Sequence, residues 1–144
     1  MSLKRILIVE DDSDTRLAYH ILLKVKHYET FFAKDPLSCL WEAHKNRPDL
    51  ITMDIGLTAG DGFRAMAQLK SADHLAKIPV IVVSGLDIQM LKERALQSGA
   101  IAYFQKPFEQ DKFLQTITQL IGNSSEEGAR IYPMNARRLA QINT

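Results

Sequence analysis

Acidic residues follow the ends of two short apolar runs in this sequence. A Glu-Asp-Asp triplet at positions 10–12 comes directly after Ile6–Val9, and the apolar run that begins at Leu50 ends at Asp54. Short runs without polar alternation are typical of parallel strands covered on both faces. Open α/β sheets bind ligands at the carboxyl ends of such strands. A lone aspartate there could equally be a helix cap or a turn residue, but the repeated pattern favours a site.

Two later apolar runs also end in groups that could do chemistry. Ile78–Val83 stops at Ser84, and Ala100–Phe104 is followed by Gln105 and then Lys106. If these strands lie side by side, their polar residues gather at one edge with the acids. Clustered carboxylates repel one another, so such a site requires a cation or a raised pKa. Oxygen ligands without paired histidine or cysteine favour a hard ion, and Mg²⁺ is the natural choice.

Together these groups predict phosphoryl-transfer chemistry. A metal ion, the ammonium group of Lys106 and the hydroxyl group of Ser84 would surround the carboxylate of Asp54. Positioning and charge neutralisation provide most of the catalysis in such sites. Asp54 would be the nucleophile, and its product an acyl phosphate.

Five predicted strands alternate with five predicted helices, and these elements must position the site. This alternation predicts an α/β fold with a doubly wound, five-stranded parallel sheet of order 2-1-3-4-5, which is flavodoxin-like. The second strand, 28–33, is polar at its start and suits a sheet edge. Asp12 or Ser13 can cap the first helix, and Lys34-Asp35-Pro36 is interpreted as an ordinary turn before the second. The predicted helices cover a first segment that follows the cap and carries apolar residues from Leu17 to Val25, about 37–46, a segment from about 63, about 87–98, and a last segment ending near 121.

The spacing of apolar residues predicts which helix faces pack against the sheet. Each predicted face is a stripe at helical spacing. Cys39 and Trp41 are expected at or near the buried face of the second helix, and Gly99 is expected to end the fourth. The stripes are Leu17, Ala18, Ile21, Leu22 and Val25; Leu37, Leu40, Trp41 and His44; Met66 and Leu69; and Phe113, Leu114, Ile117, Leu120 and Ile121.

Composition restricts the class of protein. The 144 residues suit one domain, and 46% hydrophobic residues suffice for a core. The 18 basic and 17 acidic residues give a net charge of +1, which argues against a nucleic-acid or membrane-surface protein. The single cysteine, Cys39, excludes an internal disulfide framework and suits a reducing cytoplasm. No stretch approaches the roughly 20 apolar residues of a membrane span.

Four sets of residues, at their joint spacing, resemble the receiver domain of two-component response regulators. The resemblance covers residues 4–121, which predicts a receiver domain over 4–122 and a C-terminal tail or linker over 123–144. It implies the CheY-like (βα)5 fold. The four sets are Glu10-Asp11-Asp12; Asp54 with Asp61-Gly62; Ser84-Gly85; and Gly99-Ala100 with Tyr103 and Lys106-Pro107.

The resemblance also implies roles for the site residues. Asp54 would accept a phosphoryl group from a histidine kinase or a histidine phosphotransfer protein. Asp11 would bind Mg²⁺ directly, Glu10 through water, and Asp54 and the backbone carbonyl of Gly56 would complete the ligand set.

Further implied roles concern the phosphoryl group and the output. Ser84, Gly85 and Lys106 would contact the phosphoryl group, Ser84 and Tyr103 would be the switch pair, and Pro107 would follow a cis peptide bond. The face formed by the fourth helix, fifth strand and last helix could form a homodimer. The chain would act in the cytoplasm without binding nucleic acid directly, and would catalyse only its own phosphorylation and dephosphorylation.

The loop after Asp54 departs from the family pattern. Thr58 stands where a proline is usual, and Gly56 offers no side chain to shield an acyl phosphate. Two alternatives remain open: a degenerate receiver that serves as an unphosphorylated interaction module, and a haloacid-dehalogenase-like phosphatase. The second requires an acid where Gly56 stands.

Overall fold

The computed structural model describes residues 3–56, 62–85 and 89–123. Within these ranges five parallel strands form one sheet of order β2-β1-β3-β4-β5, which confirms the predicted fold and places β2 at an edge. The predictions for the loop 57–61, for a helix start at residue 87 and for the tail from 124 lie outside the described residues. The elements are β1 (Arg5–Val9), α1 (Ser13–Val25), β2 (Glu29–Ala33), α2 (Pro36–Asn46), β3 (Leu50–Asp54), α3 (Gly62–Ser71), β4 (Val80–Ser84), α4 (Gln89–Gln97), β5 (Ala102–Gln105) and α5 (Gln110–Ile121).

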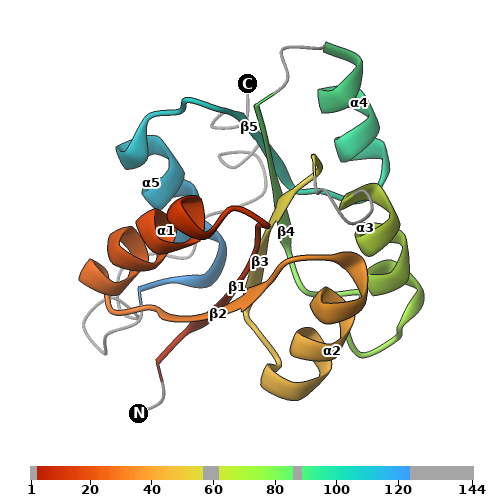
Figure 1. Ribbon diagram of the computed structural model, residues 1–144, viewed down its shortest axis with the longest axis horizontal. Coiled ribbons are helices and arrows are strands. Elements are labelled where there is room, and N and C mark those ends of the chain that lie inside the picture. Colours follow the sequence, from red (N-terminus) through yellow and green to blue (C-terminus); the bar gives the residue numbers. More distant parts are fainter. Residues whose placement is uncertain (1–2, 57–61, 86–88, 124–144) are drawn as a thin grey trace.

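Helices cover both faces of the sheet. In Figure 1, α1 and α5 lie on one side of the strands, and α2, α3 and α4 lie on the other. Alternate residues of each strand enter different cores: Ile6 and Ile8 pack with α1 and α5, whereas Leu7 and Val9 pack with α2 and α3. In the described part of the chain, no helix has the length and apolarity needed to cross a membrane.

The strand register aligns the carboxyl ends of the strands. Val9 is paired with Met53, so the residues that follow β1 lie beside Asp54 at the end of β3. Asp54 is paired with Val83, which places Ser84 one residue further along β4. The predicted polar residues therefore share one edge of the sheet.

The first two helices begin at aspartate caps. The Asp12 side chain accepts a hydrogen bond from the Thr15 backbone N–H at 2.9 Å, as one of the sequence alternatives predicted. Asp35 is also a cap rather than part of an ordinary turn. It forms a capping box with Ser38, and Pro36 occupies the first helical position, where its missing N–H costs nothing.

The predicted buried face of α1 is wrong. Leu17, Ile21 and Val25 are 55–69% exposed, and Ala18 is also exposed. The helix instead buries Tyr19 and Leu23, and only Leu22 of the predicted stripe packs against the core. Tyr19 stacks on Phe113 of α5, with ring centroids 5.9 Å apart. Because this aromatic contact lies on the face toward the sheet, the apolar stripe is turned toward solvent.

The expected packing of Trp41 is wrong as well. Trp41 is 65% exposed and Leu37 is 79% exposed, whereas Cys39 is fully buried as expected. Of the predicted stripe of α2, only Leu40 packs partly against the core, whereas Leu37, Trp41 and His44 are exposed. The residues buried instead are the small Cys39 and Ala43, which bring α2 close to the sheet. Elsewhere the predictions are confirmed: Met66, Leu69, Phe113 and Ile117 are buried, and Leu114, Leu120 and Ile121 pack partly against the core.

Candidate functional site

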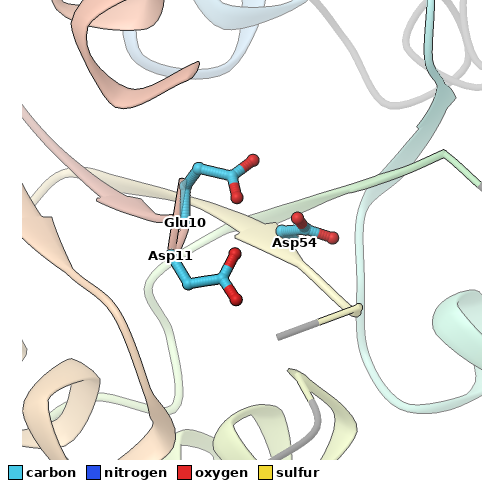
Figure 2. A group of neighbouring side chains, drawn as sticks. All are labelled: Glu10, Asp11 and Asp54. Carbon is cyan, nitrogen blue, oxygen red and sulfur yellow. The ribbon is translucent and has the colours of Figure 1, made fainter. Parts of the chain in front are cut away.

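Three carboxylates meet at the carboxyl edge of the sheet. Glu10 and Asp11 follow β1, and Asp54 is the last residue of β3 (Figure 2). One carboxylate oxygen from each lies within 4.8 Å of those of the other two. Glu10 and Asp54 are buried and Asp11 is partly exposed, so the cluster can be reached from solvent on the Asp11 side. This is the oxygen-only set that suits a hard divalent ion.

Lys106 extends from the end of β5 into this cluster. Its ammonium nitrogen lies 2.7 Å from Glu10 Oε1 and 3.5 Å from Asp54 Oδ2. The Lys106 backbone N–H donates to the Ser84 carbonyl at 2.7 Å, which fixes the end of β5 against β4. The Lys106–Pro107 peptide bond is cis, as the resemblance implied. One ammonium group is thus shared by two buried carboxylates.

The pKa values reflect this crowding. Burial raises the pKa of Glu10; the hydrogen bond from Lys106 opposes this shift, and the charge of Asp54 adds to it. Burial alone would lower the pKa of Lys106, but its hydrogen bond to Glu10 and the nearby negative charges outweigh burial and raise it. Lys106 therefore stays charged but does not fully compensate the acids, which leaves the cluster suited to a further cation.

Two glycines shape the surroundings of Asp54. The Gly56 N–H donates to Asp54 Oδ1 at 2.9 Å, which orients the carboxylate. A Cβ atom at Gly56 would lie 3.5 Å from that oxygen, an ordinary contact. At Gly62, a Cβ atom would lie 2.7 Å from the Asp54 carbonyl oxygen and from Ile55 Cα. Only glycine therefore allows the start of α3 to lie this close to the end of β3.

Sequence reasoning did not assign a role to two further residues of the site. Arg16 Nη1 donates to the carbonyl oxygens of Glu10 and Asp11 at 3.0 and 3.1 Å, and so holds the acidic turn against α1. The ring of Tyr19 is buried near Lys106, and burial, partly offset by the Lys106 charge, raises the pKa of Tyr19 to about 12. The available signal was the position of Arg16, four residues after Asp12, in the first turns of the predicted helix.

The other predicted site residues lie on β4 and β5. Ser84 ends β4 and is buried. Gly85 follows it, and a Cβ atom there would meet nothing within 4 Å. Tyr103 is on the neighbouring strand, opposite Val82, and is half-buried. The structure thus places all of the predicted residues at or near one edge of the sheet.

Comparison with known proteins agrees with this geometry. The family described as response regulator receiver domain matches residues 6–118. The chain is similar to the polar-differentiation response regulator DivK of Brucella anthropi, with 36% identity over 84% of this chain and 98% of that protein. DivK of Brucella ovis is 34% identical with the same coverage.

Solved receiver domains have the same fold. The receiver domain of the sensor histidine kinase PA1611 of Pseudomonas aeruginosa, which holds a magnesium ion in its active-site cleft, is 25% identical and superposes with a TM-score of 0.76, over 83% of this chain and 98% of that one. The signal receiver domain of the DNA-binding response regulator merR of Colwellia psychrerythraea is 28% identical, with a TM-score of 0.77, over 82% and 98%. The family match, the relatives and the shared fold show that this chain belongs to the response regulator receiver domain family.

Proposed function

We propose that Asp54 accepts a phosphoryl group from a phosphohistidine of a histidine kinase or a histidine phosphotransfer protein. The observation that carries this proposal is the arrangement of Lys106 and the three acids around Asp54. The acceptor is oriented by a backbone N–H, has a fixed ammonium group at 3.5 Å, and lies at the partly exposed edge of the sheet. A receiver that served only to bind partners would not need three acids and a lysine gathered around one carboxylate, so the degenerate-receiver alternative is disfavoured.

The transfer exchanges one bond to phosphorus for another. An oxygen of the Asp54 carboxylate forms a P–O bond while the P–N bond to the donor imidazole breaks, and the imidazole nitrogen leaves with the electron pair. The Lys106 ammonium group lies on the Oδ2 side of Asp54, where it would stabilise negative charge on the phosphoryl oxygens. Ser84 and Gly85, at the end of the adjacent strand, would line the other side of the phosphoryl group.

The residues present also fit Mg²⁺. Asp11, Asp54 and the Gly56 carbonyl would hold the ion directly. Glu10 would act through water, because Lys106 and the Asp12 N–H already engage its two carboxylate oxygens. Bound Mg²⁺ would neutralise the charge of the phosphoryl oxygens as they approach the acids. The magnesium ion in the cleft of the related PA1611 receiver domain supports this assignment.

Phosphorylation with a small donor tests the acceptor. With Mg²⁺ and acetyl phosphate, the protein should gain one phosphoryl group by intact-mass measurement, and hydroxylamine should remove it. Asp54→Asn should gain none. Asp12→Asn is the matched control, since it removes a neighbouring acid that caps α1 and should label normally. Equal labelling of Asp54→Asn would refute the acceptor, and labelling in EDTA would refute the metal role of Asp11.

The output would be a repacked surface. A phosphoryl group on Asp54 offers acceptors toward which the Ser84 hydroxyl can move, and Tyr103 on the adjacent strand can turn into the space vacated. Each charge-assisted hydrogen bond contributes roughly 1.5–3 kcal/mol, enough to bias a switch of a few kcal/mol. The face formed by α4, β5 and α5 would then bind a partner or a second copy.

A serine variant tests this coupling. Ser84→Ala should still be phosphorylated, yet lose most of the amide chemical-shift changes that beryllofluoride produces around residues 85–105. Changes as large as in the wild type would show that the signal leaves the site by another route.

A further inference from the structure

Two histidines that are 30 residues apart meet on the surface away from the acidic cluster. His44 lies in the last turn of α2, and His74 lies in the segment after α3. His74 Nε2 is 2.7 Å from His44 Nδ1, and the ring centroids are 4.5 Å apart. Both side chains are exposed. A helix that follows a parallel strand runs back along it, so these helix ends lie toward the opposite edge of the sheet from Asp54.

From this geometry we propose that His44 and His74 form a surface binding site for a borderline divalent transition-metal ion, with Cu²⁺ preferred. Imidazole nitrogen is a ligand for Zn²⁺, Ni²⁺ and Cu²⁺, and Cu²⁺ binds most tightly in this series. Mg²⁺ prefers oxygen ligands, so the two sites of this domain select different ions. The inference is independent of the function proposed for Asp54.

The spacing of the two nitrogens fits an ion that both can bind. With metal–nitrogen distances of about 2.0 Å, neighbouring ligands lie about 2.8 Å apart in square-planar geometry and about 3.3 Å apart in tetrahedral geometry. The observed 2.7 Å is the length of the hydrogen bond between the rings, and it shows that both nitrogens can reach one ion. The preference for Cu²⁺ rests on its place in the affinity series. One ring nitrogen now donates a proton to the other. When the ion binds, that proton moves through solvent to the other nitrogen of the same ring, so that both facing nitrogens present lone pairs.

Both histidines are held by folded segments. Cys39 and Ala43 are fully buried and fix α2 against the core. Leu75, next to His74, is 1% exposed, and its backbone N–H donates to the Ala72 carbonyl at 2.9 Å. The backbone therefore holds the two rings next to each other. In the hydrogen bond each ring nitrogen points at the other ring, so an ion binds when both rings turn until their nitrogens point at it.

The local charges act in opposite directions on a cation bound at His44, so we expect moderate affinity. The negative end of the α2 dipole lies at His44. Lys45 is in the same turn, and Arg47 donates to the His44 carbonyl at 3.2 Å. These positive side chains oppose a divalent ion, and the protein supplies two ligands, so water completes the coordination.

The single tryptophan of the chain reports on this site. Trp41 is three residues before His44 on the same exposed face of α2, and Cu²⁺ quenches tryptophan fluorescence on contact. Metal-free protein is titrated with Cu²⁺ in saturating Mg²⁺, which occupies the carboxylate cluster. We expect saturable quenching with one ion per chain. His74→Gln, which is far from Trp41 in the sequence, should raise the midpoint by about tenfold or more, and His44→Gln should do the same.

The control is His27→Asn, which removes another exposed imidazole at a position with φ of 66°, a conformation that asparagine tolerates. Its midpoint should equal that of the wild type. Electron paramagnetic resonance of the Cu²⁺ complex should show coupling to two imidazole nitrogens in the wild type and fewer in His74→Gln. An unchanged midpoint in His74→Gln, or identical nitrogen couplings in both proteins, would overturn the proposal.

Discussion

Replacing Lys106 by methionine removes the ammonium group that Glu10 and Asp54 share. Methionine keeps most of the side-chain volume, so the change is mainly in charge. Glu10 is 2% exposed, and without Lys106 its carboxylate faces Asp54 with no cation between them. The metal-free variant should therefore be less stable than the wild type.

The size of the loss follows from distance and burial. At 2.7 and 3.5 Å each pair has a gross attraction of about 5–6 kcal/mol at an effective dielectric constant of about 20. Removing one partner of a buried pair costs about 3–5 kcal/mol. The Lys106 side chain is 27% exposed and water can enter where it was, so we expect a loss of about 1–3 kcal/mol.

Urea unfolding followed by circular dichroism in EDTA measures this loss. A change of about 2 kcal/mol lowers the midpoint by about 1 M when the slope is near 2 kcal/mol per M. Lys112→Met, at an exposed position of α5, is the matched control and should change stability by less than about 0.5 kcal/mol.

Two further measurements identify the cause. Glu10→Gln combined with Lys106→Met should lose less than the sum of the single variants, with a coupling of about 1–2 kcal/mol. Mg²⁺ should stabilise Lys106→Met more than the wild type, because the uncompensated acids bind a cation more tightly. Additive losses, or equal stabilisation by Mg²⁺, would refute the account of Lys106 as the shared counter-charge.

Three other substitutions test the close packing at Gly62, the shielding of Asp54 by residue 56, and the cap of α2. Gly62→Ala should destabilise the domain by about 1–3 kcal/mol in urea unfolding, because its Cβ atom would meet the Asp54 carbonyl at 2.7 Å; a midpoint equal to that of the wild type would show that α3 can move away freely. Gly56→Leu should slow loss of the phosphoryl group several-fold in a time course of intact mass, because its side chain would shield Asp54 Oδ1; unchanged decay would show that water reaches the acyl phosphate elsewhere. Asp35→Ala should lose a helix cap that contributes about 1 kcal/mol at neutral pH. Hydrogen bonds from Ser38 hold the pKa of Asp35 below its ordinary value. The charge-dependent part of this stability is therefore present above pH 4 and is lost as the pH falls through the lowered pKa. A difference in unfolding free energy between wild type and variant that stays constant on acidification would contradict this.

The sequence alone was sufficient to predict the sheet and the residues at its carboxyl edge. Short apolar runs that end in acid, serine and lysine are local patterns, and the connectivity rules for parallel strands then bring the ends of the runs together. Asp54, Ser84 and Lys106 could therefore be placed at one edge without knowledge of any side-chain contact. The cap at Asp12 is equally local, since it needs only the N–H of Thr15.

Tertiary structure decided which face of each helix is buried. On α1, the stripe of Leu17, Ile21 and Val25 and the pair Tyr19 and Leu23 both have helical spacing, so periodicity cannot distinguish between them. The inward face is selected by the aromatic contacts of Tyr19 with α5, which are made between elements distant in the sequence.

The sequence also did not predict which residues, distant along the chain, the fold brings into contact. Glu10 was expected to act through a metal-bound water, but the structure also makes it the partner of Lys106, 96 residues later. His44 and His74 show no metal-binding spacing along the chain and become neighbours only because α2 packs beside α3. Local sequence patterns determine which side chains reach the edge of the sheet or the surface. The packing of whole helices and strands determines the distances between those side chains. These distances decide which charges neutralise each other and which side chains can bind one ion.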